Sequence, residues 1–297
     1  MSKIQPLKPE LQRIANEELN EIPQRIPNYL QKLKQWITDQ SHLKARTDDQ
    51  FLVQFLRHSH YNLEEAKRRI EVFLTYKTKF PSEVQFVSNR FREIYNLGCV
   101  TPLPIPLNDC GSRIVFYRYL YSPKIYRIEE ILVVCNALNE SLILSDPYAC
   151  ICGIIFVFDM SSASMAHIRH YTPAVVRRLV EFYEKSLPLT IRKICFVNVP
   201  LGAEHLFKLL SLFLGEELRR RLFICGQNMT KLTEQIPQKY LPEDYGGSNG
   251  NLDQLVKDND KIWNVNHKYF EEDYMYGIIQ NRHPRKANDI GGLLKNS

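Results

Sequence analysis

The sequence predicts an α/β protein in which a helical N-terminal bundle precedes a domain with a mostly parallel sheet. In the first third of the chain, apolar residues recur at helical spacing. After the turn-rich stretch TPLPIPLNDCG, short β-branched and aromatic runs alternate with helical segments, which favours a layered α/β fold. We place the helical unit at residues 10–95, the sheet domain at 96–252 and a partly helical, otherwise peripheral tail at 253–297.

Three helices are expected in the first unit. The segments IPNYLQKLKQWITDQ, DDQFLVQFLRH and NLEEAKRRIEVFLTYKTKF each carry an apolar stripe on one face. The third segment has a clear start, because Asn62 can cap the helix and Glu65 can reach back to the Asn62 amide. We expect these helices to pack as a small bundle, with AKRR on a solvated face.

The sheet domain is expected to begin with the alternating strand SRIVFYRYL, followed by the helix RIEEILVVCNALNESLIL and the buried strand CGIIFVFDM. A second helix opens at Thr172, with Pro173 in its first turn, and precedes the strand RKICFVNVP. A short strand at LFIC, a short helix around NMTKLTEQI and the turn-rich loop IPQKYLPEDYGGSNG complete the pattern.

The stretch EHLFKLLSLFLGEELRRRL, residues 204–222, is unusually apolar for a surface helix. Its apolar residues cover more than half of the helix circumference, whereas a helix packed on one core has a narrower stripe. Three consecutive arginines, at 219–221, lie near the end of this stretch, after its apolar part. Two interpretations stay open: a helix with two apolar environments, or a helix buried on all sides in a large core.

Composition excludes several classes of protein. The 297 residues are 44% hydrophobic and 24% charged, which is ordinary for a globular chain. The net charge of +6 is weaker than nucleic-acid binders show, so we expect no nucleic-acid partner, although clustered charge would favour anionic surfaces. Seven cysteines without a C-x-x-C pair and a start without a secretory h-region indicate a cytoplasmic protein. The longest apolar run, 149–158, is too short to span a bilayer.

Motifs of catalysis are missing from the sequence. It has no phosphate loop, no dinucleotide fingerprint and no nucleophile elbow. Asp159, at the end of a predicted strand, is the best candidate for a catalytic carboxylate, but an aspartate there commonly caps the next turn. The pairs His58 with His60 and His167 with His170 lack the further ligands that a zinc site needs. We therefore expect no metal, no cofactor and no enzymatic activity.

In order along the chain, FLVQFLRHSHYNLEEAKRRIE, IIFVFDM, TPAVVRRLVEFYEKSLPLTIRKICFVNVP, the apolar helix and LPEDYGG resemble the CRAL-TRIO lipid-transfer family. The resemblance covers residues 30–252 and is closest to the branch that holds α-tocopherol transfer protein and cellular retinaldehyde-binding protein. It implies a cage with a sheet floor and a mobile lid helix that encloses one hydrophobic lipid.

The resemblance also implies which residues contact that lipid. Strand parity already groups Ile154, Phe156 and Phe158 on one side of their strand. The residues implied for the cavity are Tyr117, Ile154, Phe158, Leu179, Phe182, Tyr183, Leu187, Leu189, Ile191 and Ile194, and those implied for the lid are Leu206, Phe207, Leu209, Leu210, Phe213 and Leu214. From apolarity alone, each of these residues could equally belong to an ordinary core.

A basic surface is implied as well, at which the tocopherol relative binds phosphoinositide headgroups. The candidate residues here are Arg57, Arg192, Lys193, Arg219, Arg220 and Arg221. Three positions that are basic in that relative carry Ser59, Thr190 and Glu217 in this chain, which weakens the expectation of headgroup specificity. A solvated face on which these cations form salt bridges with Glu216 and Glu217 is the alternative.

The sequence thus predicts an intracellular, monomeric carrier that holds a tocopherol, a retinoid or a similar lipid. It would meet membranes transiently, and contact with phosphoinositides or other anionic lipids would promote release. Two other functions stay open. One is an interaction scaffold that reuses the fold, and the other is a hydrolase that uses Asp159 with His167 or His170.

Overall fold

A five-stranded sheet forms the centre of the computed structural model, which describes residues 4–80, 88–258 and 260–279. The strand order is β2-β3-β4-β5-β6, with β2 antiparallel to β3 and the other neighbours parallel. This confirms the predicted α/β class and the mostly parallel sheet. The strands are β2 Val100–Pro102, β3 Arg113–Arg118, β4 Ile154–Asp159, β5 Ile191–Val197 and β6 Leu222–Gly226.

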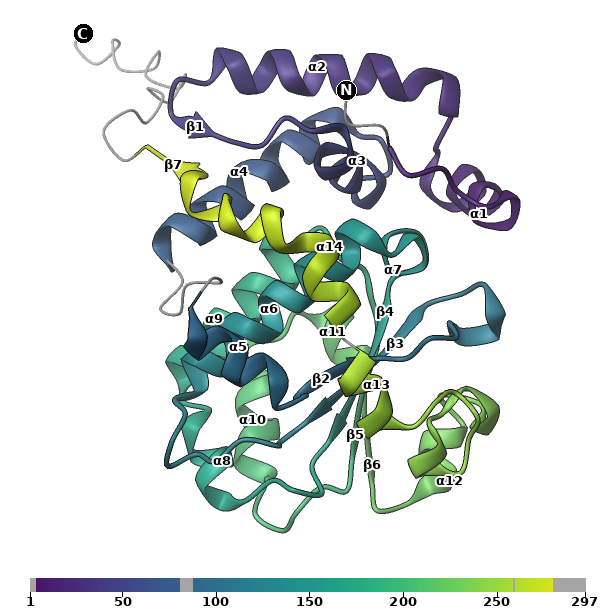
Figure 1. Ribbon diagram of the computed structural model, residues 1–297, viewed down its shortest axis with the longest axis vertical. Helices are drawn as coiled ribbons and strands as arrows, with labels where there is room; N and C mark the ends of the chain where they lie inside the picture. Colours follow the sequence, from purple (N-terminus) through teal and green to yellow (C-terminus); the bar gives the residue numbers. More distant parts are fainter. Residues whose placement is uncertain (1–3, 81–87, 259, 280–297) are drawn as a thin grey trace, which may run out of the picture.

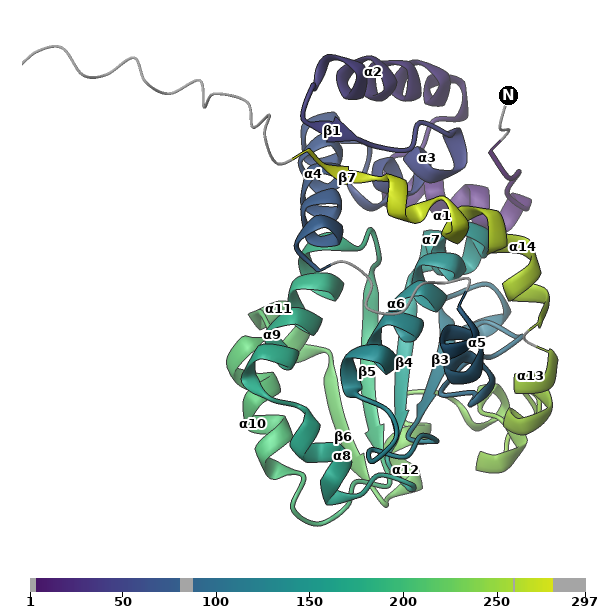
Figure 2. The same cartoon turned by 60° about the vertical axis from the view of Figure 1, so that its left-hand side comes forward.

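The two faces of the sheet bury separate apolar layers, because side chains alternate along each strand. Ile154 and Phe156 belong to a large core with the helices on one face, whereas Ile155 and Val157 belong to a smaller core with residues 232–252 on the other. Figures 1 and 2 show these layers. The first face carries α6 Ile128–Ser145, α7 Pro147–Cys152, α8 Met165–His170, α9 Pro173–Val180, α10 Glu204–Phe213 and α11 Glu216–Arg220; the second carries α12 Met229–Thr233, η4 Gln238–Tyr240, η5 Glu243–Tyr245 and α13 Leu252–Asp258.

The N-terminal unit is helical, as the apolar spacing predicts. The Asn62 side chain accepts a hydrogen bond from the Glu65 amide, so the predicted cap is present. Glu65 itself is held by Arg68, at 2.6 Å between Oε1 and Nη2. The helices are α1 Pro9–Leu19, η1 Pro23–Arg25, α2 Ile26–Asp39, α3 Asp49–His58, α4 Leu63–Lys79 and α5 Asn89–Asn96. One continuous core joins α2, α3 and α4 to the first face of the sheet.

The C-terminal segment is less peripheral than its sequence suggests. It comprises α14 Asp260–Glu271, η6 Asp273–Met275 and β7 Gly277–Ile278, and it returns to the N-terminal unit, where β7 pairs with β1 Leu43–Lys44 (Figure 1). The Arg46 guanidinium lies 4.1 Å from the centre of the Tyr269 ring. Strand pairing and this cation–π contact hold the segment against the N-terminal unit. The polar composition of the segment does not predict these contacts. Residues 280–297 of the predicted tail lie outside the described residues.

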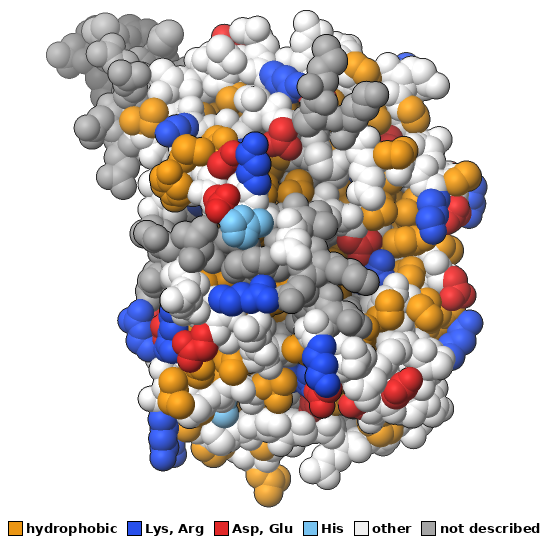
Figure 3. Space-filling model, in the orientation of Figure 1, with side chains coloured by type: hydrophobic (Ala, Val, Ile, Leu, Met, Phe, Trp, Pro, Cys, Tyr) orange, Lys and Arg blue, Asp and Glu red, His pale blue; other side chains and the backbone are white. Residues whose placement is uncertain are grey.

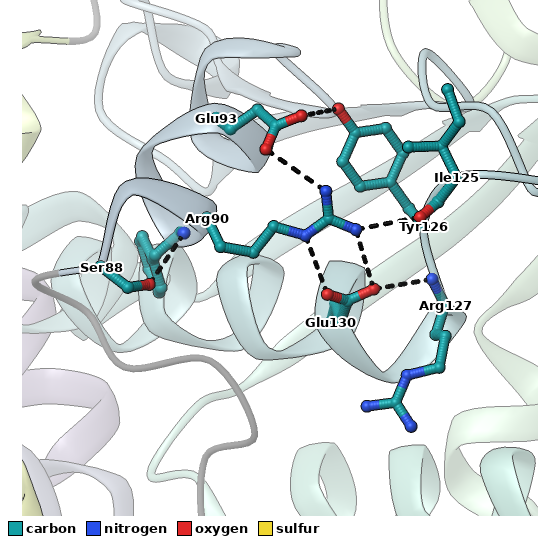
Figure 4. A network of polar contacts seen from close by, with 8 residues as sticks. Ser88, Arg90, Glu93, Ile125, Tyr126, Arg127 and Glu130 are labelled. Carbon is teal, nitrogen blue, oxygen red and sulfur yellow. Dashed lines mark hydrogen bonds and ion pairs between the residues drawn. The ribbon is translucent and has the colours of Figure 1, made fainter.

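A network of polar contacts fixes the start of α6 (Figure 4). Arg90 of α5 donates to both oxygens of Glu130, at 2.9 and 3.2 Å, and to the Ile125 carbonyl at 2.9 Å. The Tyr126 hydroxyl donates to Glu93 at 2.7 Å. The hydrogen bond from Arg90 lowers the pKa of Glu130, so this network persists at mildly acidic pH. It anchors the loop that leads from β3 into α6.

A buried ionic cluster ties the C-terminal segment to α4 and α6. The Lys77 Nζ lies 2.8 Å from Glu140 Oε2 and 2.6 Å from Asp273 Oδ2. Burial raises the pKa of Glu140 to about 7, and the neighbouring Lys77 only partly offsets that rise. The folded protein therefore holds a proton on Glu140 at pH values where the unfolded chain has lost it.

We expect the wild type to lose stability, relative to Glu140→Gln, as the pH rises from about 4.5 to 7. The folded state binds more protons than the unfolded state in this window, so the slope reaches at most about 1.4 kcal/mol per pH unit. Urea unfolding of both proteins between pH 5 and 8 measures the difference. A difference that stays constant across this range would contradict the raised pKa.

Candidate functional site

An apolar cavity of about 130 Å³ lies between the first face of the sheet and helices α6, α9 and α10. Aromatic side chains of adjacent strands form its floor: the Tyr117 and Phe158 rings stack at 4.7 Å, and Phe158 and Phe196 stack at 4.9 Å. Leu179 and Tyr183 contribute from the α9 side. The lining is nearly free of charged side chains, so this site is suited to a hydrophobic ligand.

The structure brings six of the ten implied cavity residues to the cavity wall. These are Tyr117, Phe158, Leu179, Tyr183, Ile191 and Ile194. The other four, Ile154, Phe182, Leu187 and Leu189, are buried in the same core without lining the cavity. Phe182 precedes Tyr183 on the helix and points elsewhere, with its ring 5.0 Å from Tyr76 of α4. Neighbouring helical residues face directions about 100° apart, which explains the separation.

Several wall residues were missed from the sequence. Helix α6 lines the cavity with Ile128, Ile131, Leu132 and Cys135. This spacing is the i, i+3, i+4, i+7 stripe of a buried helical face, so the pattern itself could have found them. A second group lies beyond the end of β3 and beside α9, and nothing local in the sequence marks it: Cys99, Tyr119, Tyr121 and Tyr171.

Helix α10 covers one side of the cavity with two leucines one turn apart, and a third leucine follows directly after the helix. Leu206, Leu210 and Leu214 line the cavity, and Phe207 packs edge-on against Phe196 at 5.0 Å. The remaining implied lid residues, Leu209 and Phe213, are respectively buried and partly buried in the same core. Leu212, in contrast, is 72% exposed on the outer face. The broad apolar arc therefore serves an inner and an outer environment.

Both ends of α10 have backbone features that permit a change of direction. Gly202 precedes the helix with φ of +88°, a conformation that favours glycine. After the helix, Leu214 is extended, and the Gly215 amide donates to Glu184 Oε2 at 3.3 Å. A side chain at Gly215 would place its Cβ only 2.1 Å from Glu184 Oε1. Glu184 belongs to a π-helical turn, Glu181–Ser186, that continues α9.

Phenol groups supply most of the polarity of the cavity. Burial raises the pKa of Tyr119 to about 12, and it raises the pKa values of Tyr117, Tyr171 and Tyr183 as well. These hydroxyls stay protonated at any physiological pH. The phenols therefore offer neutral hydrogen-bonding groups, and the charged residues in the lining are Arg118 and Glu184.

Arg57 has a structural partner. Its side chain is 3% exposed, with Nε 2.8 Å from Glu21 Oε2, and the Tyr61 hydroxyl donates to the same oxygen at 2.7 Å. Burial alone would raise the pKa of Glu21, but its hydrogen bonds and the charge of Arg57 outweigh burial and lower it. The structure thus places Arg57 in a buried ion pair, whereas Arg192 pairs with Glu18 at the surface.

The remaining implied cations gather where β5 and β6 begin, and each has a partner within the molecule. Arg192 donates to the Cys152 carbonyl at 2.9 Å, Lys193 to the Gln235 carbonyl at 2.8 Å, and Arg219 to the Leu214 carbonyl at 2.9 Å. Arg220 pairs with Glu216, and Arg221 pairs with Glu217. These pairs match the salt-bridged face that is the alternative to a phosphoinositide site. Arg220 and Glu216 are both well exposed, so their pairing contributes little stability.

The residues considered for catalysis have separate partners. Asp159 Oδ1 accepts hydrogen bonds from the Ser161 amide and from Asn198 Nδ2, each at 2.9 Å, so it caps a turn as its position suggests. The His167 ring contacts the Ser164 hydroxyl and the Tyr121 carbonyl, both at 2.8 Å. In the described part of the chain, no three metal-ligating side chains gather, and none of its helices has the length and apolarity needed to cross a bilayer.

Together, these features define an α/β protein with a lidded apolar cavity. Residues 108–247 match the family model described as "CRAL/TRIO domain", and residues 22–83 match "Pinta-like, UBA domain". The first match agrees with the family that the sequence motifs resemble. The matched regions fall within the predicted units 96–252 and 10–95.

Similar proteins extend over most of the chain. "Alpha-tocopherol transfer protein-like" of Mus musculus is 26% identical over 272 residues, which cover 90% of this chain and 76% of that protein. "Clavesin-2" of Homo sapiens is 26% identical over 250 residues, which cover 81% of this chain and 75% of that protein. The crystal structure of Sfh5 aligns with a TM-score of 0.48 at 12% identity, covering 85% of this chain and 92% of that one.

We expect Arg57→Met to destabilise the protein by about 3–5 kcal/mol, because it leaves the buried Glu21 without its partner. The matched control is Arg13→Met, which breaks the exposed pair between Arg13 and Glu17 and should cost at most about 1 kcal/mol. Urea unfolding compares the two. Equal and small effects would show that Arg57 is not held in this pair.

Proposed function

We propose that this protein is a non-enzymatic carrier that takes one hydrophobic lipid into the cavity and transfers it between membranes. The apolar cavity under α10 is the observation that carries this proposal. Moving a lipid from water into this cavity is favoured by a free energy of roughly 25 cal/mol for each Å² of its apolar surface that becomes buried. The match of residues 108–247 to the CRAL/TRIO domain and the similarity to a protein named "Alpha-tocopherol transfer protein-like" support the same function.

The size of the cavity supports a lid that moves. Its volume of about 130 Å³ is smaller than the roughly 300–1,000 Å³ of typical ligand pockets. A tocopherol, a retinoid or a lipid of similar size therefore needs α10 to shift outward. Gly202 precedes α10 with φ of +88°, and the Gly215 amide after the helix makes only a long hydrogen bond to Glu184, so we assign this shift to α10. Loading and release then become a shift between closed and open populations.

The outer face of the lid supports a membrane as the place of exchange. Leu201 is 94% exposed just before α10, and Leu212 is 72% exposed near the C-terminal end of the helix. Figure 3 shows hydrophobic side chains at the lower end of the molecule, where α8 and α10 lie in Figure 1. Exposed cations adjoin this end, Arg169 on α8 and Lys208 on α10. Each basic residue near an anionic bilayer contributes about 1 kcal/mol of attraction.

In the cell, the carrier would act as a cytoplasmic monomer that meets membranes transiently. Release triggered by phosphoinositide headgroups is a finer part of the proposal. The cations at the start of β5 and in and after α11 support this part because they lie close to one another. To bind there, a phosphate group would have to displace Glu216 from Arg220 and Glu217 from Arg221.

An interaction scaffold that reuses the fold is the second candidate function. The small volume of the cavity favours it, because a collapsed cavity would need no ligand. The two functions differ in one respect that can be measured. Only the carrier should accelerate the movement of a lipid between vesicles.

We expect Leu212→Asp to slow the transfer of a fluorescent tocopherol between anionic vesicles by about tenfold, because the side chain no longer enters the bilayer. Tyr274→Asp is the matched control: Tyr274 is 86% exposed, in η6 far along the chain from α10, and transfer should not change. Both variants should unfold like the wild type. Transfer that is unaffected by Leu212→Asp would contradict the membrane contact of α10, and a wild type without transfer activity would favour the scaffold.

A further inference from the structure

A second cleft lies at the carboxyl ends of the parallel strands, on the second face of the sheet. Its volume is about 420 Å³, which falls within the range of small-molecule sites. Arg118 ends β3, Asp159 ends β4, and Asn198 directly follows β5. In open α/β sheets, ligands bind in the crevice outside these strand ends. The remaining lining residues come from the layer on the second face: Met229, Asp244, Tyr245 and Leu252.

Arg118 carries donors that the protein itself does not use. Its side chain is 12% exposed, and Nη1 donates to Asp253 of α13 at 2.8 Å, which places the guanidinium on the second face. The Nε and Nη2 atoms are buried and have no hydrogen-bond partner in the described part of the chain. These two nitrogens share one edge of the planar guanidinium, and such an edge pairs with both oxygens of a carboxylate. Because unpaired buried donors are costly, a carboxylate bound on this edge is favoured.

Asp159 places a negative charge beside this edge. Arg118 and Asp159 are register partners on adjacent parallel strands, yet no ion pair among the described residues joins them. The Asp159 carboxylate is buried, and its Oδ1 accepts from the Ser161 amide and from Asn198 Nδ2, each at 2.9 Å. Asp244 adds a further carboxylate, but that residue is exposed, so water screens its charge. The cleft therefore presents a cation and an anion side by side.

These charges distinguish between classes of ligand. A simple anion on Arg118 is repelled by Asp159, and a simple cation beside Asp159 is repelled by Arg118. A zwitterion avoids both penalties, because its carboxylate pairs with the guanidinium and its ammonium donates to Asp159. The rest of the lining favours an apolar substituent on that zwitterion, since it includes Met229, Leu252 and the ring of Tyr245.

We propose that this cleft binds a free α-amino acid with an apolar side chain, through Arg118 on its carboxylate and Asp159 on its ammonium. The inference does not depend on the carrier function, because of the described residues Arg118 alone lines both this cleft and the apolar cavity. It gives Asp159 a binding role in addition to its turn cap.

Isothermal titration calorimetry of the full chain with L-leucine and three analogues tests the proposal. 4-Methylpentanoate lacks the ammonium, 3-methylbutylamine lacks the carboxylate, and glycine lacks the apolar side chain. Leucine should bind about tenfold more tightly than each analogue, because each analogue loses one charged or apolar contact. Absence of leucine binding at millimolar concentrations would overturn the proposal. Equal binding of leucine and 4-methylpentanoate would also overturn it, since a simple anion site would explain that result.

Asp159→Asn is the sharpest variant, because an amide oxygen can still accept from the Ser161 amide and only the negative charge is lost. Leucine should bind to this variant about tenfold more weakly, whereas 4-methylpentanoate should bind more tightly than it does to the wild type. A variant with unchanged affinities for both compounds would contradict the role of Asp159.

Arg118→Gln should abolish leucine binding, and Asp253→Asn is its matched control. Both changes break the ion pair between Arg118 and Asp253, but only the first removes the unused edge of the guanidinium. Asp253 is 76% exposed, so its replacement should leave leucine binding as in the wild type. Equal loss of binding in both variants would overturn the assignment of the edge.

Thermal melting of each variant shows whether the fold is retained, and the comparison of the four compounds on the wild type needs no variant at all. The titrations involve no lipid. Failure of leucine to bind would therefore refute this site and leave the carrier function standing.

Discussion

Closure of the apolar cavity by α10 is the constraint on which the rest of the structure depends. The first face of the sheet exposes aromatic side chains such as Phe158 and Phe196, and these need an apolar cover. Leu206 and Leu210 of α10 supply this cover, together with Leu214 just after the helix. At this end, the Gly215 amide donates to Glu184 at 3.3 Å and Arg219 donates to the Leu214 carbonyl at 2.9 Å. This cover is apolar on its inner side and carries the exposed Leu212 on its outer side, which is the combination that the proposed exchange at a bilayer requires.

The other walls of the cavity are fixed much more firmly. Helix α6 is anchored at its start by Arg90 and Glu130 and near its end by the buried contact between Glu140 and Lys77. The second contact also recruits the C-terminal segment through Asp273, so the N-terminal unit, α6 and that segment support one another. Buried ion pairs thus hold α6, and no comparable ion pair of the described residues holds α10. In the proposed carrier, the cavity therefore opens at α10.

The sequence predicts the fold well because its signals are local. Apolar spacing, the Asn62 cap and the Thr172–Pro173 start specify helices without tertiary information. The contacts of the C-terminal segment are not predictable from local sequence, because its partners, Arg46 and β1, lie more than 200 residues away in the chain.

The site was only partly predictable, for similar reasons. Strand parity places Phe158 and Ile194 on the cavity face, but apolarity does not tell a wall residue from the core residue behind it, as Tyr183 and Phe182 show. The partners of basic residues are also invisible in sequence. For example, Arg57 is buried against Glu21, whereas Arg192 is exposed beside Glu18, and the sequence around them does not predict this difference.

Mass spectrometry of an organic extract from the purified protein tests the central claim most directly. If the cavity under α10 holds a lipid, the extract should contain one hydrophobic molecule per protein chain, and the tocopherol or a similar lipid offered in excess should replace it. An extract without lipid, together with a protein that binds no member of a panel of tocopherol, retinoids, carotenoids and phosphoinositides, would contradict the carrier function and leave the scaffold.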